Sequence, residues 1–455
     1  MGIISTKAIK YSSNTQTNYI EGIPAYIGNL LQAGIEVRLG RTKGGQIYIK
    51  GSLFNAVKLL SEHPQYKDRI YFDTFAEKTY YTDHNKRDRE WDDNLTNKIR
   101  YEMEDRFYAT FTKDTIESAV RLAAERNKRN PLWEYIDSLP KWIPEKEEKR
   151  IDFILHRYFG VKDTKLTRLY SRKSMIAIIA RMQATIHNPV KCDNCLVLFG
   201  EQGKHKSSAL GILALEHVFG KRYFCDTPFD MGHKDANQVV EGKLIVELQE
   251  LAKRSKDKEV EKAFISAQIA RFRRSHAKHV TEHARKCFMI ATTNKGNILS
   301  DCTGSRRFWP VTIGQDMGKR KLKKGEKWKI DTKGLLSVIE DLYREALYYY
   351  RQGEPHWLSD DEEDLRIEDA QDYEDEHPLH NEIMKQARKL QADNIAVQVG
   401  EIIRCLFEDL QDPNKHLKES TRKNQAIITD VLLKEGWSYK RWSKGGKTVR
   451  GWNTK

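Results

Sequence analysis

The segment from 196 to 208, LVLFGEQGKHKSS, constrains the fold of this chain more than any other. Its apolar start, Leu196–Phe199, predicts a buried strand, and the glycines that follow let the backbone turn closely around an anion. A lysine and two serines come next, at the start of a helical pattern. A strand, a glycine turn and a helix N-terminus in this order are typical of a phosphate-binding loop in a parallel α/β fold.

Each position of this loop has a chemical role to fill. Lys206 would reach the β- and γ-phosphate oxygens, and the Ser207 hydroxyl would bind Mg²⁺. His205 stands where the usual motif has its last glycine, and it is accommodated there if its backbone angles are ordinary. The alternative is a chance glycine turn before an amphipathic helix. The candidate nucleotide-binding residues are Gly200, Gly203, Lys204, His205, Lys206, Ser207 and Ser208.

Two further apolar segments end in polar residues that suit nucleotide chemistry. In LIVELQEL (244–251), a buried strand places Glu247 near its C-terminal end, and Glu250 follows three residues later. One carboxylate would hold Mg²⁺ through water and the other would polarise the attacking water, and the spacing does not decide which. The alternative for this segment is a buried strand with a solvent-facing glutamate.

The next strand, CFMIATTN (287–294), ends in Asn294, which would hydrogen-bond the γ-phosphate or the attacking water in the role called sensor 1. Three apolar strands that end in a glycine loop, a glutamate and an asparagine are much less expected by chance than any one of them. Short apolar strands separated by helices predict a parallel sheet that is covered on both faces. We expect the nucleotide at its carboxyl edge.

Basic residues gather around the third strand. Arg307, in DCTGSRRFWPV, would reach a phosphate of its own or of a neighbouring subunit, or it would anchor the packing of Phe308 and Trp309. The segment 270–287 is dense in Arg, Lys and His between two core strands, so it must be a surface excursion. It would grip single-stranded DNA in a ring channel, or it is a solvated charged helix. Its DNA-binding candidates are Arg273, Lys278 and His279.

Composition limits the class of protein. The chain has 455 residues, of which 39% are hydrophobic and 32% charged, the balance of a folded protein with several domains. Its net charge of +14 favours a polyanionic partner, with nucleic acid the commonest, although a merely basic protein is the alternative. No apolar run approaches 18 residues, so we expect a cytoplasmic protein that does not enter the membrane. Its six cysteines lack a zinc-binding pattern.

Proline positions, charge and periodicity predict five regions. The prolines at 131, 140 and 144 mark the end of the first, in which 69–82 reads as a β-hairpin. The regions are a mixed α+β N-terminal module (1–140), a helical linker (141–185), the core (186–358), an acidic linker (359–384) and a C-terminal domain (385–455).

The C-terminal region has the layout of a winged helix-turn-helix. Two amphipathic helices precede two short aromatic strands around a Gly-Gly turn, and residues 413–455 hold 11 Lys/Arg against 3 Asp/Glu. This excess suits contacts with the phosphates of duplex DNA, although a wing that binds protein is the alternative. The candidate DNA-binding residues here are Lys440, Arg441, Lys444 and Lys447.

Taken together, these segments resemble the virulence-associated protein E family, P-loop ATPases of phages, prophages and mobile genomic islands that are related to superfamily 3 helicases. The resemblance covers about 190–360 strongly and 90–185 more faintly. It is carried by GEQGKHKSSAL, the E-x-x-E-L at 247–251, KAFIS at 262–266, ARKCFMIATTN, TGSRRFWPV and YRQGEPHWL at 350–358.

The resemblance implies an AAA+-like core, ATP hydrolysis with Mg²⁺ and a ring-shaped homo-oligomer, expected to be a hexamer, that helps to replicate a mobile element in a bacterial host. Lys206 and Ser207 would bind phosphate and metal, and Asn294 would be the sensor. Glu247 and Glu250 would be the acidic pair, although they are not adjacent as in the family pattern, so the water-activating residue stays open. Arg285 and Arg307 are the candidate trans-acting arginines.

The sequence thus predicts a DNA-dependent ATPase, a replicative helicase or initiator that translocates single-stranded DNA. The N-terminal 140 residues show no polymerase-type acidic pattern, so priming is not assigned, and a separate primase is kept as a candidate partner. The alternative is a non-catalytic DNA- or nucleotide-binding initiator, which His205 and Gln249 favour. A small-molecule P-loop kinase is disfavoured by the basic C-terminal region and by the RRFW segment.

Overall fold

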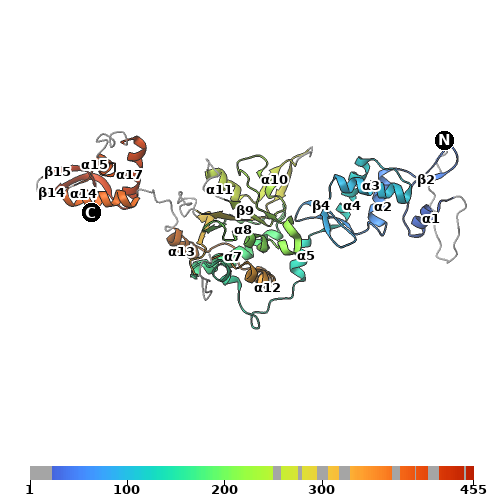
Figure 1. The fold of residues 1–455 in the computed structure, drawn as a ribbon, viewed down its shortest axis with the longest axis horizontal. Helices are drawn as coiled ribbons and strands as arrows, with labels where there is room; N and C mark the ends of the chain where they lie inside the picture. Colours follow the sequence, from blue (N-terminus) through green and yellow to red (C-terminus); the bar gives the residue numbers. More distant parts are fainter. Residues whose placement is uncertain are drawn as a thin grey trace. The chain divides into compact units, whose positions relative to one another are not determined.

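The computed structural model (Figure 1) divides the chain into two compact units. The first comprises Met1–Asn294 and Arg307–Glu363, and the second Lys295–Arg306 and Asp364–Lys455. The structure describes residues 23–249, 258–274, 279–294, 306–316, 328–370, 380–394, 396–407, 420–444 and 447–454.

The N-terminal part of the first unit is a mixed α+β module with its own apolar core. Its four-stranded sheet has the order β5-β4-β3-β6, and the hairpin expected at 69–82 is formed by antiparallel β3 and β4. Its elements are α1 (Ala25–Gln32), β1 (Leu39–Arg41), β2 (Ile47–Ile49), α2 (Leu53–Glu62), β3 (Ile70–Asp73), β4 (Lys78–Thr82), β5 (Asp88–Glu90), α3 (Asp93–Phe107), α4 (Lys113–Arg126), β6 (Lys128–Arg129) and α5 (Pro131–Ser138).

Side-chain caps explain where the helices of this module begin. Ser52, Asp92 and Thr112 each accept a hydrogen bond from a main-chain N–H in the first turn of α2, α3 and α4. Pro131, the first of the prolines that mark the end of this module, does not interrupt it but begins helix α5. Proline is tolerated at the first helical position because its missing N–H has no intrahelical partner there, and Asn130 caps the helix.

The rest of the first unit surrounds a five-stranded sheet of order β13-β7-β12-β9-β8, in which every pairing is parallel. This confirms the predicted parallel sheet. Its elements are η1 (Ile151–Phe153), α6 (Ile154–Phe159), α7 (Lys165–Met182), β7 (Cys195–Phe199), α8 (Lys206–Leu213), α9 (Glu216–Phe219), η2 (Gly220–Arg222), β8 (Phe224–Cys225), α10 (Ala236–Val240), β9 (Ile245–Gln249), α11 (Lys258–Ser266), β10 (Ile269–Phe272), β11 (Thr281–Ala284), β12 (Phe288–Thr293), β13 (Phe308–Thr312) and α12 (Thr332–Arg351).

Helices cover this sheet as the apolar strands require. Helices α7 and α8 contact β12 and β9 respectively, and α12 packs on both helices, while α10 and α11 lie across the sheet from them (Figure 1). All residues of β7 and β12 are buried. The Trp309 ring, from β13, stacks on the Tyr170 ring, from α7, with the two ring centroids 5.0 Å apart. Burial on both faces holds the strands rigidly beneath the loops at their carboxyl ends.

The described residues of the basic segment between β9 and β12 include two strands, β10 and β11. Strands β10 and β11 pair as an antiparallel hairpin, from Ile269 opposite Ala284 to Phe272 opposite Thr281. The helix considered as an alternative for 270–287 is therefore wrong. Strand pairing wins because Ala270 and Phe272 alternate inward with exposed Ile269 and Arg271. Lys278 lies outside the described residues.

The C-terminal unit has a separate apolar core that includes Ile402, Leu432, Trp437 and Trp452. Among the described residues of this unit, the helices at 380–393, 399–406 and 422–434 precede an antiparallel pair of strands, and a bridge joins Val397 to Trp452. The winged-helix-like assignment stays a prediction. Part of the expected acidic linker forms α13, which crosses the boundary between the units. The elements are α13 (Asp360–Ala370), α14 (His380–Asp393), α15 (Val399–Leu406), α17 (Arg422–Lys434), β14 (Ser438–Lys444) and β15 (Lys447–Asn453).

Candidate functional site

The glycine loop, residues 200–205, leads from the end of β7 into α8. A Cβ built on Gly200 would lie 2.3 Å from Ile313 Cγ1, so a larger residue does not fit, and Gly203 has a φ of +77°. His205 has φ 65° and ψ 31°, in the left-handed region. The condition stated for accommodating His205, ordinary backbone angles, is therefore not met. The loop needs at this position the conformation that glycine adopts at no steric cost.

Lys206 points from the first turn of α8 toward the sheet edge. Its Nζ donates hydrogen bonds to the carbonyl oxygens of Gly200, at 2.6 Å, and Thr293, at 3.2 Å. Partial burial lowers the pKa of Lys206, and the nearby Glu247 opposes this shift. Main-chain oxygens thus hold the ammonium group where the glycine loop meets the end of β12. A phosphate oxygen can replace such neutral acceptors with a stronger charged one.

Glu247 lies beside this lysine although it comes from another strand. It is the third residue of β9 and is 1% exposed, so the expected position near the strand end is corrected to the strand centre. Its Oε1 accepts hydrogen bonds from Ser207 Oγ, at 3.0 Å, and from Thr292 Oγ1, at 2.8 Å. Its Oε2 is buried and has no hydrogen-bond donor among the described residues. A buried carboxylate oxygen beside a serine hydroxyl fits the oxygen ligands that Mg²⁺ takes.

Strand β12 lies between the strand of the glycine loop and the strand of Glu247. Asn294 directly follows Thr293 at the end of this strand and is exposed. The sequence reasoning missed Thr292, whose hydroxyl fixes Glu247, although the Thr-Thr-Asn run was a signal. Gln249 donates to the Asp226 carbonyl, at 3.0 Å. Glu250 lies outside the described residues, so its role stays a prediction.

The two candidate trans-acting arginines contact their own chain. Arg285 is 4% exposed, donates to Asn237 Oδ1 at 2.7 Å and lies over the Phe264 ring at 4.3 Å. Burial lowers the pKa of Arg285. A role at a neighbouring nucleotide would require Arg285 to leave this enclosure. Arg307 is half-buried and donates to Ser266 Oγ at 2.8 Å. Both trans-acting roles stay predictions.

The remaining candidates are spread over three surfaces. Ser208 is exposed in the first turn of α8, and Lys204 pairs with Glu201 at 3.0 Å. Arg273 and His279 are exposed on either side of the β10–β11 tip. The exposed DNA-binding candidates of the second unit, Lys440 and Arg441, lie on β14, while the side chains of Lys444 and Lys447 lie outside the described residues.

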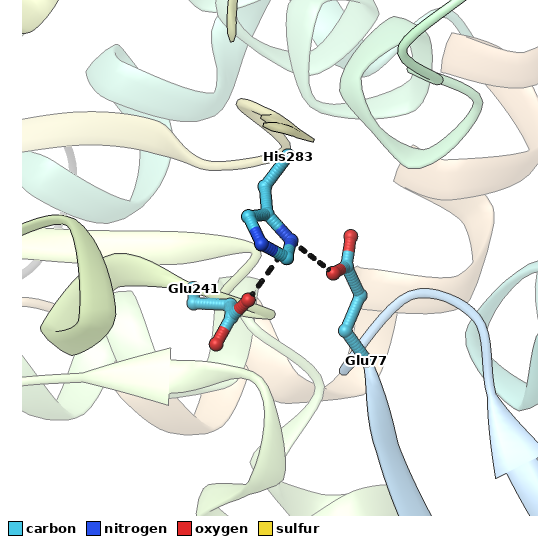
Figure 2. Close-up of side chains that lie close together, drawn as sticks. All are labelled: Glu77, Glu241 and His283. Atoms are coloured by element: carbon cyan, nitrogen blue, oxygen red, sulfur yellow. Dashed lines mark hydrogen bonds and ion pairs between the residues drawn. The ribbon is translucent and has the colours of Figure 1, made fainter. Parts of the chain in front are cut away.

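A second cluster of polar side chains lies where the N-terminal module contacts the rest of the first unit. Figure 2 shows His283, from β11, between two carboxylates, with Nδ1 2.6 Å from Glu77 Oε2 and 3.2 Å from Glu241 Oε1. One ligand atom from each of the three side chains lies within 4.8 Å of the others, which is close enough to hold a metal ion.

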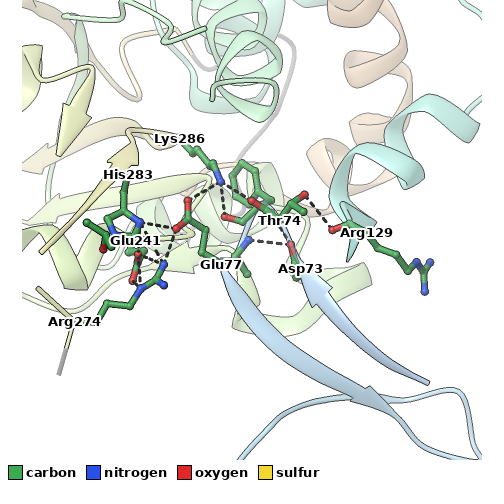
Figure 3. A network of polar contacts seen from close by, with 11 residues as sticks. Asp73, Thr74, Glu77, Arg129, Glu241, Arg274, His283 and Lys286 are labelled. Atoms are coloured by element: carbon green, nitrogen blue, oxygen red, sulfur yellow. Dashed lines mark hydrogen bonds and ion pairs between the residues drawn. The ribbon is translucent and has the colours of Figure 1, made fainter. Parts of the chain in front are cut away.

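The surrounding cations argue against a metal ion there. Figure 3 shows that Arg274 NH2 contacts both carboxylates, at 2.6 Å each, and that Lys286 Nζ lies 3.0 Å from Glu77 Oε1. Burial would raise the pKa of Glu77, but Lys286 and His283 outweigh it and lower that pKa. Arg274 and Lys286 already balance the two carboxylates, so a metal ion would have to displace one of these cations. We interpret this ion-pair network as a structural joint.

No described helix of the structure is long and apolar enough to cross a bilayer. No curated protein matches the sequence. Solved structures that resemble the fold include two apo structures of the NrS-1 C-terminal region. They are 15% and 14% identical to this chain, each with a TM-score of 0.41, and the alignments cover 85% and 84% of this chain and 95% and 94% of the other.

The comparison with protein families gives a direct result. The Virulence-associated protein E-like domain matches residues 136–375, more than half of the chain. This range includes the glycine loop, β9, β12 and β13. The resemblance found in the motifs is confirmed, and the chain belongs to the virulence-associated protein E-like family.

Proposed function

We propose that this protein is a DNA-dependent ATPase that acts in the replication of a phage or mobile element. Membership of the virulence-associated protein E-like family fits a replication protein of that kind. The observation that carries the ATPase assignment is the meeting of Lys206, Ser207 and Glu247 at one edge of the parallel sheet. A lysine, a hydroxyl and a buried carboxylate so arranged suit a nucleoside triphosphate with its cation.

The chain's residues would bind ATP by exchanging contacts they already make. Lys206 would leave the Gly200 and Thr293 carbonyls for the β- and γ-phosphate oxygens, and the N-terminus of α8 would face the same anion. Ser207 and the free oxygen of Glu247 would hold Mg²⁺, which neutralises charge on the phosphates. The AAA+-like P-loop fold of the core is part of this proposal.

Hydrolysis requires groups that position the attacking water. Asn294, at the end of β12, would hydrogen-bond the water or the γ-phosphate, and Glu250 or Glu247 would take its proton. In a ring of identical subunits, Arg307 or Arg285 of one subunit would stabilise charge on the nucleotide of the next. The expected assembly is a hexamer.

DNA is the partner that the charge of the chain favours, since the net charge is +14. The β10–β11 hairpin would contact single-stranded DNA with Arg273, Lys278 and His279. The second unit, read as a winged-helix-like domain, would contact duplex DNA through β14 and β15. Nucleotide turnover would move the hairpin and translocate the strand, as in a superfamily 3-like helicase.

Lys206→Ala tests the site. Loss of the ammonium group should lower ATP turnover at least about a hundredfold, because it removes a charged contact to the transferred phosphate. ATP hydrolysis is measured with and without single-stranded DNA. Lys191→Ala is the matched control. It removes an exposed lysine that precedes the start of β7, away from the glycine loop at the end of that strand, and should retain turnover. Native turnover by Lys206→Ala would refute the assignment.

A second candidate function, a non-catalytic nucleotide- or DNA-binding initiator, is favoured by one observation. His205 holds a left-handed conformation at the loop position where the usual motif has glycine. A strained loop that binds nucleotide without turnover would suit a regulator. Zero hydrolysis with intact DNA binding in the unmodified chain would support this candidate over the ATPase.

A further inference from the structure

The β1–β2 hairpin of the N-terminal module carries an unusual concentration of exposed positive charge. We name residues 38–50 the basic hairpin. No acidic residue occurs from 37 to 61, and none of the hairpin's cations has an ion-pair partner among the described residues. The exposed cations of the basic hairpin are Arg38, Arg41, Lys43 and Lys50.

Several other cations of the same module are neutralised by neighbours. Lys78 lies 2.7 Å from Glu90, and Lys113 lies 3.1 Å from Asp93. Arg129 pairs with Glu134 at 2.6 Å. The acidic partners in these pairs belong to other elements of the module, and Glu36 is the acidic residue nearest in sequence to the basic hairpin. Four uncompensated charges on one short hairpin attract a polyanion.

A buried asparagine fixes the base of the basic hairpin. Asn55, from α2, is 0% exposed, and its Nδ2 donates to the carbonyls of Arg38 and Lys50, at 2.8 Å each. Its Oδ1 accepts from the Arg38 N–H at 2.7 Å. Ile49 is 1% exposed in the module's core. The hairpin thus presents its cations from an anchored base, which reduces the entropy lost when a ligand binds.

An aromatic ring shares one face with two of the cations. Tyr48 is opposite Gly40, and the Lys50 N–H donates to the Arg38 carbonyl, so strand alternation puts Arg38, Tyr48 and Lys50 on the same face. A Cβ on Gly40 would lie 2.6 Å from Tyr48 Cζ, so the glycine makes room for the ring. The Tyr48 side chain is 39% exposed. Exposed rings between cations are the combination that binds single strands.

We propose that the basic hairpin binds single-stranded nucleic acid. The cations neutralise backbone phosphates, and Tyr48 stacks on a base. This site lies in the N-terminal module, outside the family match at 136–375, and is separate from β10–β11 and from the second unit. It goes beyond the proposed function, since the binding requires no nucleotide hydrolysis.

Binding of a fluorescent oligothymidylate to the full chain, measured by anisotropy over a series of salt concentrations, tests the charges. In Arg38→Gln/Lys50→Gln, the slope of log K against log salt should become less steep by about 1.4, because each phosphate contact to a single strand contributes about 0.7. The matched control is Lys86→Gln/Arg87→Gln, two exposed cations at the tip between β4 and β5, a hairpin whose sequence also carries Asp83 and Asp88. The control should keep the native slope.

Tyr48→Ala tests the stacking contact. Affinity should fall about fivefold to a hundredfold, since a base on an aromatic ring contributes about 1–3 kcal/mol, with little change in the salt slope. Thermal melting checks that these surface variants fold. ATP hydrolysis without DNA should stay native, and loss of turnover in Lys206→Ala should leave this binding intact, so the two proposals fail separately.

Photo-crosslinking of a halogenated oligonucleotide locates the contact. We expect an adduct on the peptide that contains Tyr48. Native affinity and slope in both hairpin variants would overturn the proposal, and so would adducts confined to 270–287 and the second unit. If the hairpin variants kept native DNA binding but lost binding to an acidic protein, that protein would be the partner of the basic hairpin, and the proposal would likewise be overturned.

Discussion

At the scale of single residues, His205 has the most unusual conformation of the site. It occupies the left-handed region as the residue before Lys206, and its carbonyl accepts a hydrogen bond from the Ala209 N–H. An L-residue pays about 1–2 kcal/mol for this conformation. Strain kept at a loop that faces a candidate ligand is a common property of binding sites.

Replacing His205 by glycine should release this strain. We expect His205→Gly to raise the free energy of unfolding by about 0.5–1 kcal/mol, after glycine's greater freedom in the unfolded chain is subtracted. Urea unfolding measures the change. His205→Ala keeps a Cβ and is the control, so it should match the native protein. Equal midpoints for the glycine and alanine variants would show that the loop is unstrained.

Glu247→Gln isolates the charge of the buried carboxylate. The amide oxygen still accepts from Ser207 and Thr292, so the local hydrogen bonds remain. The cation site loses its negative charge, and turnover should fall about a hundredfold or more, with a higher Mg²⁺ concentration needed for half-maximal rate. Nucleotide binding in the absence of Mg²⁺ should be unchanged. A native Mg²⁺ dependence would exclude Glu247 from the cation site.

The sequence predicted Lys206 and Ser207 because they come after an apolar strand and a glycine loop, and Glu247 because it interrupts another apolar strand. The partners that the structure adds could not be found in this way. Thr292 reaches Glu247 across two strands whose register is unknown before folding. The conformation of His205 depends on how the loop closes, and residue identity alone favours ordinary angles there.

At the scale of elements, the ion-pair network connects the turn between β3 and β4 to the β10–β11 hairpin and to Lys286 just after it. Glu77 contacts Arg274, His283 and Lys286, which come from both sides of that hairpin. Glu77 lies about two hundred positions from these three residues in sequence, and they follow no periodic pattern, so this network could not be predicted before the fold was known.

Removing the charge of Glu77 should loosen this joint. Charge-assisted hydrogen bonds in such partly buried positions contribute about 1.5–3 kcal/mol, so we expect Glu77→Gln to be destabilising by that order. Amide hydrogen exchange in β10 and β11 should become faster. Glu90→Gln, which removes the exposed partner of Lys78, is the control and should change stability by less than about 1 kcal/mol.

The pKa of Glu77 sets the pH dependence of this contribution. Because that pKa is lower in the folded protein, the stabilisation is complete above the unfolded pKa. It disappears as the pH falls through the folded pKa. The stability difference between native protein and Glu77→Gln should therefore shrink in acid. A difference that stays constant down to the lowest pH would argue against an ionised Glu77 in the joint.

At the scale of the whole molecule, two units with separate cores divide the proposed DNA contacts. Lys440 and Arg441 are exposed on β14, and the Lys440 Nζ lies 4.5 Å from the centre of the Trp442 ring. The fold class of the first unit followed from strand and helix periodicity. The ion-pair network between the N-terminal module and the hairpin next to the five-stranded sheet could not be predicted in this way, since contacts between modules leave no local pattern in the sequence.

Lys440→Gln/Arg441→Gln should weaken duplex DNA binding by the full chain. The salt slope should become less steep by about 1.8, from about 0.9 for each lost phosphate contact on a duplex. Lys385→Gln/Arg388→Gln, on exposed positions of α14 in the same unit, is the control. If both double variants bind duplex DNA with native affinity and native salt slope, we infer that the second unit binds a partner other than DNA.

Strand β12 has a mechanical consequence that follows from its neighbours along the chain. Three residues separate its start from the end of β11, and its last carbonyl, that of Thr293, accepts a hydrogen bond from Lys206. Six residues of extended chain span about 20 Å. A single rigid strand, paired on both sides, therefore joins the carbonyl that Lys206 contacts to the residues that follow β11. We expect a displacement at one end of β12 to be transmitted directly to the other end.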